Sequence, residues 1–438
     1  MSRPSISVRP IAAAAALTAI VCSTVQGQVA NPSASHLGMA NTRATLARNY
    51  EAIALNPAAL GMPGNAKWSL SIASGTAAGA GGPVSYGELL EYQSDLIPRD
   101  VKEDWVRRIE GSDNQSVEGE AGISLFAMTW GRFGVEISGS GILLADVNAD
   151  AAELMLFGNA GRTGVPADFD MGNSATNNAG IGNVALAYGM PLGLRIGSAE
   201  RQSAAIGATL HYSQAMFLVN GSNAGTQITG DPVELAINFP IVIEGFDGVN
   251  NLGSGVGLDL SGMWTNQTWS ASFGIRNIFN TFAFDLDKME YRPASAVFSG
   301  DTVGVTKFDP VPLSEGPPEL RARVENVDIE PIVDAAMAYH ATSSWLLTGA
   351  FRHRFQSGLE TVPKTYGGVG VQYSGLTRWL TLHGGLGTYG SRNQFSAGVG
   401  LDWIGLRLEL AALRRIGGDA NDQTILGLTF GYHGEGKQ

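Results

Sequence analysis

Cysteine and histidine side chains are few in this sequence, and they do not fall in catalytic motifs. The only cysteine is Cys22, and the six histidines include His211, His340 and His383. None of these histidines lies in a recognisable nucleophile motif, so a hydrolytic Ser, His and Asp site has no support in the pattern. We predict that the protein is not an enzyme.

Phosphate and metal chemistry have equally little support. The glycine-rich stretch 253–257 leads into a predicted strand, whereas phosphate-binding glycine loops lead into a helix. Cys22 lies in an N-terminal segment that we expect to be removed, which excludes disulfides and thiolate metal sites from the mature chain. We therefore expect no cofactor and no metal site.

The overall charge argues against nucleic acid as a partner. The chain has 28 basic and 40 acidic residues, and without Arg3 and Arg9 the counts are 26 and 40, a net charge of −14. Nucleic acids bind basic surfaces. Only 16% of the residues are charged, where a soluble protein usually has about 25%. Much of the protein surface is therefore predicted to avoid water.

Residues 1–27 have the three parts of a secretory signal peptide. Arg3 and Arg9 precede an apolar run from Ile11 to Val21, and small residues surround an expected cleavage site after Gly27. The apolar run is about eleven residues long, well short of the roughly 20 that a membrane helix needs. We predict an exported protein.

The rest of the chain is predicted to form membrane-spanning β-strands. From Lys67 onward, segments of about ten residues alternate apolar with small or polar side chains, as tilted strands in a bilayer do. The number of predicted strands is fourteen, and bacterial barrels have an even number. They are 66–74, 120–130, 133–145, 180–190, 203–218, 253–264, 268–278, 330–340, 344–356, 365–374, 378–388, 393–402, 405–415 and 423–432.

Short turns and long loops alternate between these strands. The chain turns in two to three residues after the second, sixth, eighth, tenth and twelfth strands, and runs for tens of residues after the first, third, fifth and seventh. This asymmetry is typical of outer-membrane barrels and places both termini in the periplasm. Every tryptophan except Trp105 lies beside a short turn or at the start of the first strand, as in an interfacial girdle. A soluble β-sandwich is the alternative, but unequal loops suit it poorly.

Alternation also separates the two faces of each strand. In the strand 405–415, Leu406, Leu408 and Leu410 oppose Arg407 and Glu409. Charge is costly on the lipid face, so the polar set is predicted to line the lumen. The same parity places further charged residues inside, namely Glu136, Asp259, Arg276, Asp334 and Arg352. The mixed signs predict ion pairs within the barrel, or contacts to a plug, rather than an ion filter of one sign.

Residues 28–65, between the signal peptide and the predicted barrel at 66–432, could fill the lumen as a plug. This segment contains Leu37-Gly38-Met39 and Asn56-Pro57-Ala58. Together with the strand number and order, these motifs resemble the FadL/TodX superfamily of outer-membrane transporters for hydrophobic compounds, including its PorV-like relatives. The resemblance implies an all-β, fourteen-stranded antiparallel transmembrane barrel with an N-terminal hatch. Asn56, Pro57 and Ala58 are then the candidate hatch residues.

Apolar residues in the predicted outer loops are candidate ligand contacts. A helical pattern follows Pro98, and Asp150 with Glu153 is expected to cap a second short helix. In a transporter these loops would gather a hydrophobic substrate, as the resemblance implies. In the alternative they pack on one another as a lid. The residues that we single out are Trp105, Leu154, Phe157 and Phe239.

The sequence thus predicts a bacterial outer-membrane barrel for passive uptake of hydrophobic small molecules, such as long-chain fatty acids. Its expected partners are outer-membrane lipid, a hydrophobic ligand and the barrel-assembly machinery, because Phe430-Gly431-Tyr432 resembles a terminal assembly signal. The residues 433–438 would follow as a tail. The alternative function is that of a PorV-like barrel, a protein-binding or secretion-system component.

Overall fold

The computed structural model describes residues 33–434, apart from 94, 194–201, 232, 246–250, 300–301, 305, 326–328, 356–363 and 418–421. The predicted signal peptide lies outside this range. Among the described residues, no helix is both long and apolar enough to cross a membrane.

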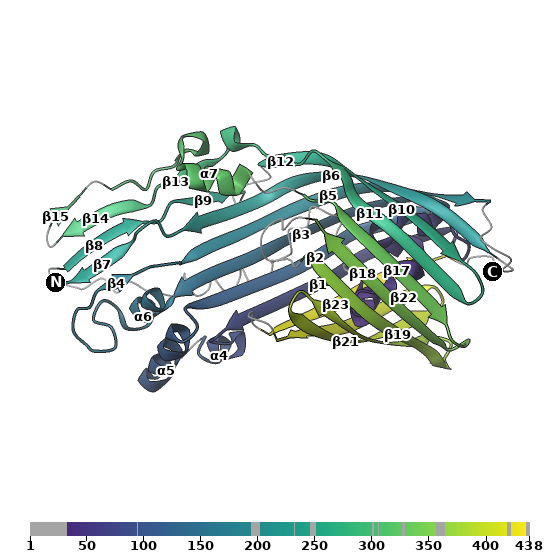
Figure 1. Cartoon of the computed structure of the whole chain (residues 1–438), viewed down its shortest axis with the longest axis horizontal. Coiled ribbons are helices and arrows are strands. Elements are labelled where there is room, and N and C mark those ends of the chain that lie inside the picture. Colours follow the sequence, from purple (N-terminus) through teal and green to yellow (C-terminus); the bar gives the residue numbers. More distant parts are fainter. Residues whose placement is uncertain are drawn as a thin grey trace.

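Fourteen antiparallel strands form a closed barrel, which confirms the predicted fold (Figure 1). The first and last strands pair with one another from Ser69↔His433 to Gly79↔Thr424, and this pairing closes the wall. The strands in order are β1 (Trp68–Gly82), β2 (Asn114–Trp130), β3 (Phe133–Asn148), β5 (Ala175–Leu192), β6 (Ser203–Ser222), β10 (Gly253–Thr265), β11 (Trp269–Asn280), β17 (Ile332–His340), β18 (Trp345–Arg354), β19 (Thr365–Thr377), β20 (Leu380–Tyr389), β21 (Arg392–Trp403), β22 (Leu406–Ile416) and β23 (Gln423–His433).

Several strands are longer than their sequence pattern indicates. β1 continues to Gly82 instead of ending at 74, and β2 begins at Asn114 instead of 120. The added part of β1 is mostly glycine and alanine, so it has no polar alternation, yet it pairs with β2 as far as Gly82↔Ser116. At the other end of the barrel, His433 belongs to β23 and not to the predicted tail.

One end of the barrel, called the turn end here, has the short connections and a ring of aromatic side chains. Neighbouring strands pair their rings across this rim, with centroids 4.5 to 5.2 Å apart. Trp130 and Trp403 project from it and are 76% and 67% exposed. Amphipathic rings prefer the interface between lipid and water, so the turn end marks one edge of the membrane-embedded band.

The opposite end, the loop end, carries the long connections. Small helices and a separate five-stranded sheet extend there beyond the barrel (Figure 1). The helical elements are α4 (Tyr86–Glu91), α5 (Arg99–Glu110), α6 (Ala149–Phe157), η4 (Leu286–Lys288), η5 (Leu313–Glu315) and α7 (Pro318–Glu325). The short strands are β4 (Phe169–Asp170), β7 (Gln227–Gly230), β8 (Val233–Asn238), β14 (Ser295–Ser299) and β15 (Thr302–Val303) in the separate sheet, and β9 (Ile241–Glu244), β12 (Ala283–Phe284), β13 (Glu290–Arg292) and β16 (Val311–Pro312) beside the barrel wall.

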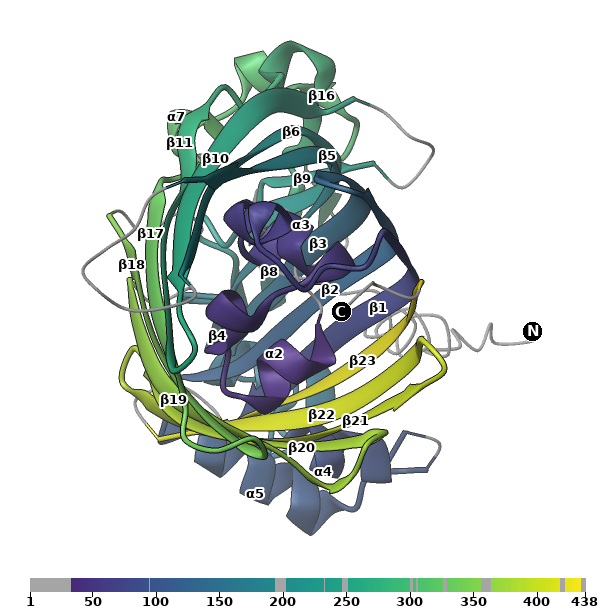
Figure 2. The same cartoon turned by 90° about the vertical axis from the view of Figure 1, so that its right-hand side faces the viewer.

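The N-terminal segment lies inside the ring of strands (Figure 2). It is a chain of short helices: α2 (Ala34–Gly38), η1 (Arg43–Leu46), η2 (Asn49–Glu51), α3 (Ala52–Leu55) and η3 (Pro57–Gly61). Ser33 begins the first of them as an N-cap, and its hydroxyl accepts a hydrogen bond from the amide of His36. We call residues 33–65 the hatch.

Replacing Leu410 by Arg should destabilise the barrel. Leu410 is 50% exposed on the outer face of β22, while its neighbour Glu409 is 1% exposed on the inner face. A charge on the lipid face near the midplane costs about 2–4 kcal/mol. The free energy of unfolding in lipid vesicles measures this loss, with Leu410→Val as the control. Unchanged stability of the arginine variant would show that the face assignment is wrong.

Candidate functional site

The predicted hatch residues form a bend between two short helices. Asn56 is extended, with φ −165° and ψ 91°, and its side-chain amide donates to the carbonyl of Ala44 at 3.3 Å. Pro57 begins η3, a position where a missing N–H leaves no hydrogen bond unmade. The bend therefore follows from the local sequence, as the Asn-Pro pair predicts.

This bend lies directly against the barrel wall. The amide of Ala58 donates to the hydroxyl of Ser261 on β10 at 2.9 Å. On β6, a Cβ added to Gly207 would come within 2.2 Å of the Ala58 nitrogen and of the Pro57 carbonyl carbon. Gly189 on β5 makes an equally close contact with Gly61. Glycine is required at these wall positions because backbone meets backbone there.

A buried ion pair holds the middle of the hatch together. Glu51 is 4% exposed and accepts from the Arg43 guanidinium at 2.7 Å through both carboxylate oxygens. The hydroxyls of Ser33 and Ser35 donate to the same carboxylate at 2.7 and 3.0 Å. Several segments of the hatch thus converge on one charge.

The same network reaches the wall through β22. Arg407 lies 4.0 Å from Glu51 and 2.5 Å from Glu409. The amide of Ser35 donates to the Glu409 carboxylate at 3.2 Å. Two of the predicted lumen residues therefore bind the hatch, which was one of the two roles expected for them.

The other predicted lumen charges also lie inside the barrel. Asp334 accepts from Arg276 at 2.7 Å and pairs with Arg352 at 2.5 Å. Asp259 accepts from the amide of Asn277 at 2.7 Å, at a register shift between β10 and β11. Glu136, on β3, is 3% exposed and forms no ion pair with any residue of the described chain. The carboxylates of Asp334, Asp259 and Glu136 therefore all belong to barrel strands and lie on the inner side of the wall.

Many hatch contacts use neutral wall residues that the sequence analysis missed. Thr429 accepts from the amide of Ala34 at 2.8 Å, and Ser396 both accepts from the amide of Ala40 and donates to the carbonyl of Gly38. Charge alternation could not single them out, because an inward serine or threonine looks like any other small residue. The further residues of this kind are Thr209, Ser261, Thr348 and Tyr366.

Two small cavities lie between the hatch and the wall. Each cavity has about 20 Å³, roughly the room for one water molecule. One lies among Tyr50, Glu51, Ser124 and Glu136, and the other is beside Asn56, Pro57 and Arg276. A ligand larger than water cannot pass these places unless the hatch or the wall moves.

Above the hatch, at the loop end, the interior is apolar. We call this group the apolar roof. It joins wall residues of β3, β5 and β6 to side chains from the long connection between β11 and β17, and all are buried. Its larger members are Ile142, Ile181, Leu218, Phe282, Met289, Leu313, Leu320 and Val324. The roof is an apolar layer above a hatch that is bound mainly by polar contacts.

The predicted loop residues do not form a single site. Trp105 is 4% exposed and packs with Ile109, Tyr92 and Ala152, so its indole is already covered by other loop residues. Leu154 and Phe157 lie on α6 and are partly exposed, whereas Phe239 lies beside Gly221 of β6. Trp105 therefore belongs to a packed lid, which was one of the two roles predicted for these residues.

Polar contacts also stabilise this lid. The capping residue of α6 is Asn148, whose side chain accepts from the amide of Ala151, and not the expected Asp150. Asn148 lies one residue before the helix, where a capping side chain can reach its first turn. Arg108 of α5 donates to Glu88 of α4 at 2.6 Å, and this hydrogen bond lowers the pKa of Glu88 to about 2. The α4–α5 contact therefore stays charged at neutral pH.

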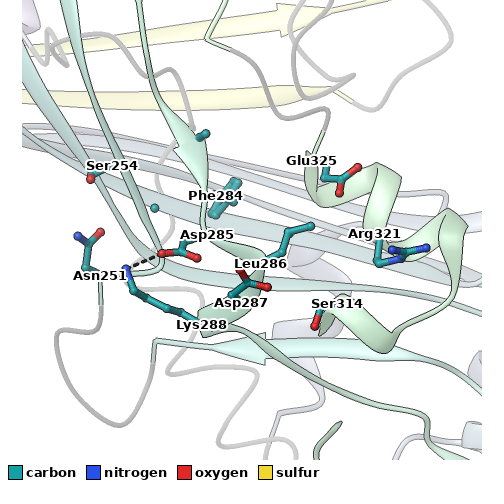
Figure 3. A pocket seen from close by; sticks show the side chains of 12 residues that line it. Asn251, Ser254, Phe284, Asp285, Leu286, Asp287, Lys288, Ser314, Arg321 and Glu325 are labelled. Atoms are coloured by element: carbon teal, nitrogen blue, oxygen red, sulfur yellow. Dashed lines mark ion pairs between the residues drawn. The ribbon is translucent and has the colours of Figure 1, made fainter. Parts of the chain in front are cut away.

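Two larger hollows lie outside the hatch region. The first, at the loop end, has about 550 Å³ and is lined by both charges and apolar groups, including Phe284, Lys288 and Arg321 (Figure 3). The second has about 390 Å³ and lies on the outer face of β5, β6, β10 and β11. Its rim is formed by exposed apolar side chains such as Ile206 and Phe273, and small residues form its floor.

Solved structures with the same fold include the following two proteins of low sequence identity to this chain. A Pseudomonas aeruginosa FadL homologue is 12% identical, with 93% of this chain and 99% of that chain covered and a TM-score of 0.51. The P. putida toluene transporter TodX is 11% identical, with 94% and 100% covered and a TM-score of 0.53. The amino-acid sequence matches no family model and no curated protein sequence. At these identities the similarity shows a common fold.

The protein is therefore an outer-membrane β-barrel with a FadL/TodX-like fold, as the sequence predicted. Three features of the structure support this location. The strands form a closed barrel, apolar side chains face outward, and a ring of aromatic side chains lies at the turn end. These are the features of bacterial outer-membrane barrels.

Replacing Glu51 by Gln should loosen the hatch while the barrel stays folded. The change leaves Arg43 buried without its charged partner, and breaking a buried pair in this way costs about 3–5 kcal/mol. Amide hydrogen exchange within residues 34–61 should become faster, with strand amides unaffected. Glu91→Gln, the same change at an exposed position of α4, is the control. Equal protection in both variants would contradict the role of the ion pair.

Replacing Gly207 by Ala should displace the hatch from the wall. The new Cβ would overlap backbone atoms of Pro57 and Ala58, which cannot rotate away. Cells with this variant should admit small hydrophilic antibiotics more readily, as measured by growth inhibition. Gly262→Ala is a matched control, since nothing lies within 4 Å of a Cβ at that position. If the two variants leak equally, the close approach does not seal the lumen.

Proposed function

We propose that this protein mediates passive uptake of hydrophobic small molecules, such as long-chain fatty acids, across the outer membrane. The observation that carries the proposal is the sequence of layers along the barrel: an apolar roof at the loop end, followed by a hatch that leaves water-sized cavities against the wall. A hydrophobic ligand can replace apolar contacts of the roof at little cost, whereas a polar solute would lose its hydration there.

The names of the structural neighbours support the same proposal. One is described as a FadL homologue and the other as a toluene transporter. Capture would begin at partly exposed loop residues such as Leu154, Phe157 and Phe239, with Trp105 supporting the lid from behind. The ligand would then enter the roof when the loop helices move apart.

Release would follow a shift of the Asn56-Pro57-Ala58 bend. Behind this bend the wall is thin, because Gly207 separates the hatch from the apolar hollow on the outer face. A ligand that leaves sideways at this place would enter the membrane through an apolar surface and avoid the water of the periplasm. This route suits hydrophobic compounds, since their transfer from water to lipid is favourable.

A disulfide between the hatch and the wall tests the proposal. Ala58→Cys with Ser261→Cys introduces one thiol into the hatch bend and one into the adjacent strand β10, whose Ser261 hydroxyl accepts from the Ala58 amide at 2.9 Å. The oxidised double variant should take up a labelled fatty acid no faster than cells without the protein, and reduction should restore uptake. Each single variant is a control for the substitutions themselves.

The alternative function, a PorV-like barrel that binds proteins, predicts a different outcome. Exposed apolar loop residues such as Leu96 and Met155, 96% and 75% exposed, would then contact a protein partner. If a deletion strain takes up every tested hydrophobic compound normally but fails to display a secreted protein, the transport proposal is wrong and the alternative replaces it.

A further inference from the structure

The hollow of about 390 Å³ on the outer face of β5, β6, β10 and β11, called the outer hollow here, follows from the pairing of these strands. Ala208 of β6 pairs with Leu260 of β10, and Ile206 pairs with Gly262. The two smallest outward residues therefore lie diagonally beside one another. Phe273 of β11 pairs with Gly262 on the other side. A depression results because the larger side chains rise around this pair.

The chemistry of the outer hollow is that of a hydrocarbon surface. Every lining residue belongs to the part of the chain that the structure describes, and none of them is charged. Ile206 and Phe273 are 44% and 52% exposed around it. The hydroxyl of Ser261, which is also among the lining residues, accepts from the amide of Ala58 on the lumen side. The outer hollow therefore offers almost no partner to a polar group.

The outer hollow lies in the membrane-embedded band, close to the turn end. β10 ends at Thr265, three residues after Gly262. At about 3.3 Å for each strand residue, the floor of the hollow begins roughly 10 Å along the strand from the turn end. Tyr188, at one edge of the hollow, belongs to the aromatic ring of that end and lies with its ring centroid 4.7 Å from that of Phe133. The hollow thus opens toward lipid tails just inside the interface.

A hollow at this place must be filled by something apolar. Its walls would lose their dispersion contacts if it stayed empty, and water would find almost no hydrogen-bond partner in it. An acyl chain on a smooth part of the barrel touches protein along one side only. In the outer hollow the same chain would touch the floor and the raised side chains of Met190 and Phe273 as well.

We propose that the outer hollow binds one acyl chain of a phospholipid from the bilayer leaflet at the turn end. Ala208 and Gly262 form the floor beneath the chain, and Tyr188 marks the level of the head group, where amphipathic rings prefer to lie. The hollow is continuous with the lipid-facing surface of the barrel, so bilayer phospholipid always surrounds it. The site does not depend on transport.

A chain bound there would lie directly behind the hatch bend. Neighbouring residues of a strand face opposite sides, so Gly207 and Ser261, next to Ala208 and Gly262, face the lumen. These two residues contact Pro57 and Ala58 of the hatch. Only the backbone of β6 and β10 would separate the bound chain from the bend.

The test uses the mature protein in vesicles of phosphatidylethanolamine and phosphatidylglycerol. A trace of phosphatidylethanolamine carries a photoreactive diazirine within one acyl chain, and labelled peptides are located by mass spectrometry after illumination. Labelling should be several-fold stronger on the residues around the outer hollow, such as Ile206 and Phe273, than on the outer face of β20 to β22. Equal labelling over the whole outer face would overturn the proposal.

Filling the hollow should remove this preference. Gly262→Phe places a ring where nothing lies within 4 Å of a Cβ, and labelling of Ile206 should fall to the level of the rest of the outer face. Gly79→Phe is the matched control, because Gly79 is an exposed glycine of β1 that also has nothing within 4 Å of a Cβ. It should leave the labelling of Ile206 unchanged. Ala208→Leu is a second filling variant if Gly262→Phe does not fold.

A free fatty acid with the same diazirine, at the same mole fraction, distinguishes the two sources of an acyl chain. The phospholipid should label the outer hollow whether or not unlabelled fatty acid is present in equal amount. If the free fatty acid labels the hollow and the phospholipid does not, the hollow is a site for free fatty acid and the proposal is wrong.

Discussion

Backbone hydrogen bonding inside the bilayer is the constraint on which the rest of this structure depends. No water is available there, so each strand must pair on both sides, and only a closed barrel leaves no open edge. The ladder between β1 and β23 meets this demand. Closure with fourteen strands also creates a wide interior, which would be a water-filled channel if nothing occupied it. The N-terminal segment occupies it.

The hatch is held by polar contacts that are individually modest. A neutral hydrogen bond contributes about 0.5–1.5 kcal/mol net, so the contacts at Thr209, Ser396 and Thr429 can break one at a time. The buried pair of Glu51 and Arg43 is different, because separating its partners leaves a buried charge. Breaking wall contacts of this kind leaves the Arg43–Glu51 pair inside the hatch intact. Movement as a unit is what the proposed uptake would require.

The wall and the hatch are adapted to one another at the same place. Gly189 and Gly207 let η3 approach the backbone of β5 and β6, and the outer face opposite them is an apolar hollow. The polar hatch interface, the apolar roof and this hollow all involve the strands β5 and β6. A hydrophobic compound would meet apolar surface before and after the hatch, while water and ions would meet a closed interior.

The sequence alone determined the features that depend on local pattern. Alternation along 405–415 separated Arg407 and Glu409 from the leucines, because side-chain direction in a strand has a period of two. The same rule placed Glu136 and Asp334 inside, and the Asn56-Pro57 pair predicted a bend.

Only the tertiary structure decided which residues meet across the lumen. Gly207 gave no signal that Pro57 packs on it, and Thr429 none that it accepts from Ala34, because these pairs are distant in sequence. The glycine-rich end of β1 is a strand because β2 pairs with it. Trp105 is buried because other loop residues cover it. Contacts of this kind depend on barrel closure and on how separate segments pack, and a pattern read along one segment does not contain that information.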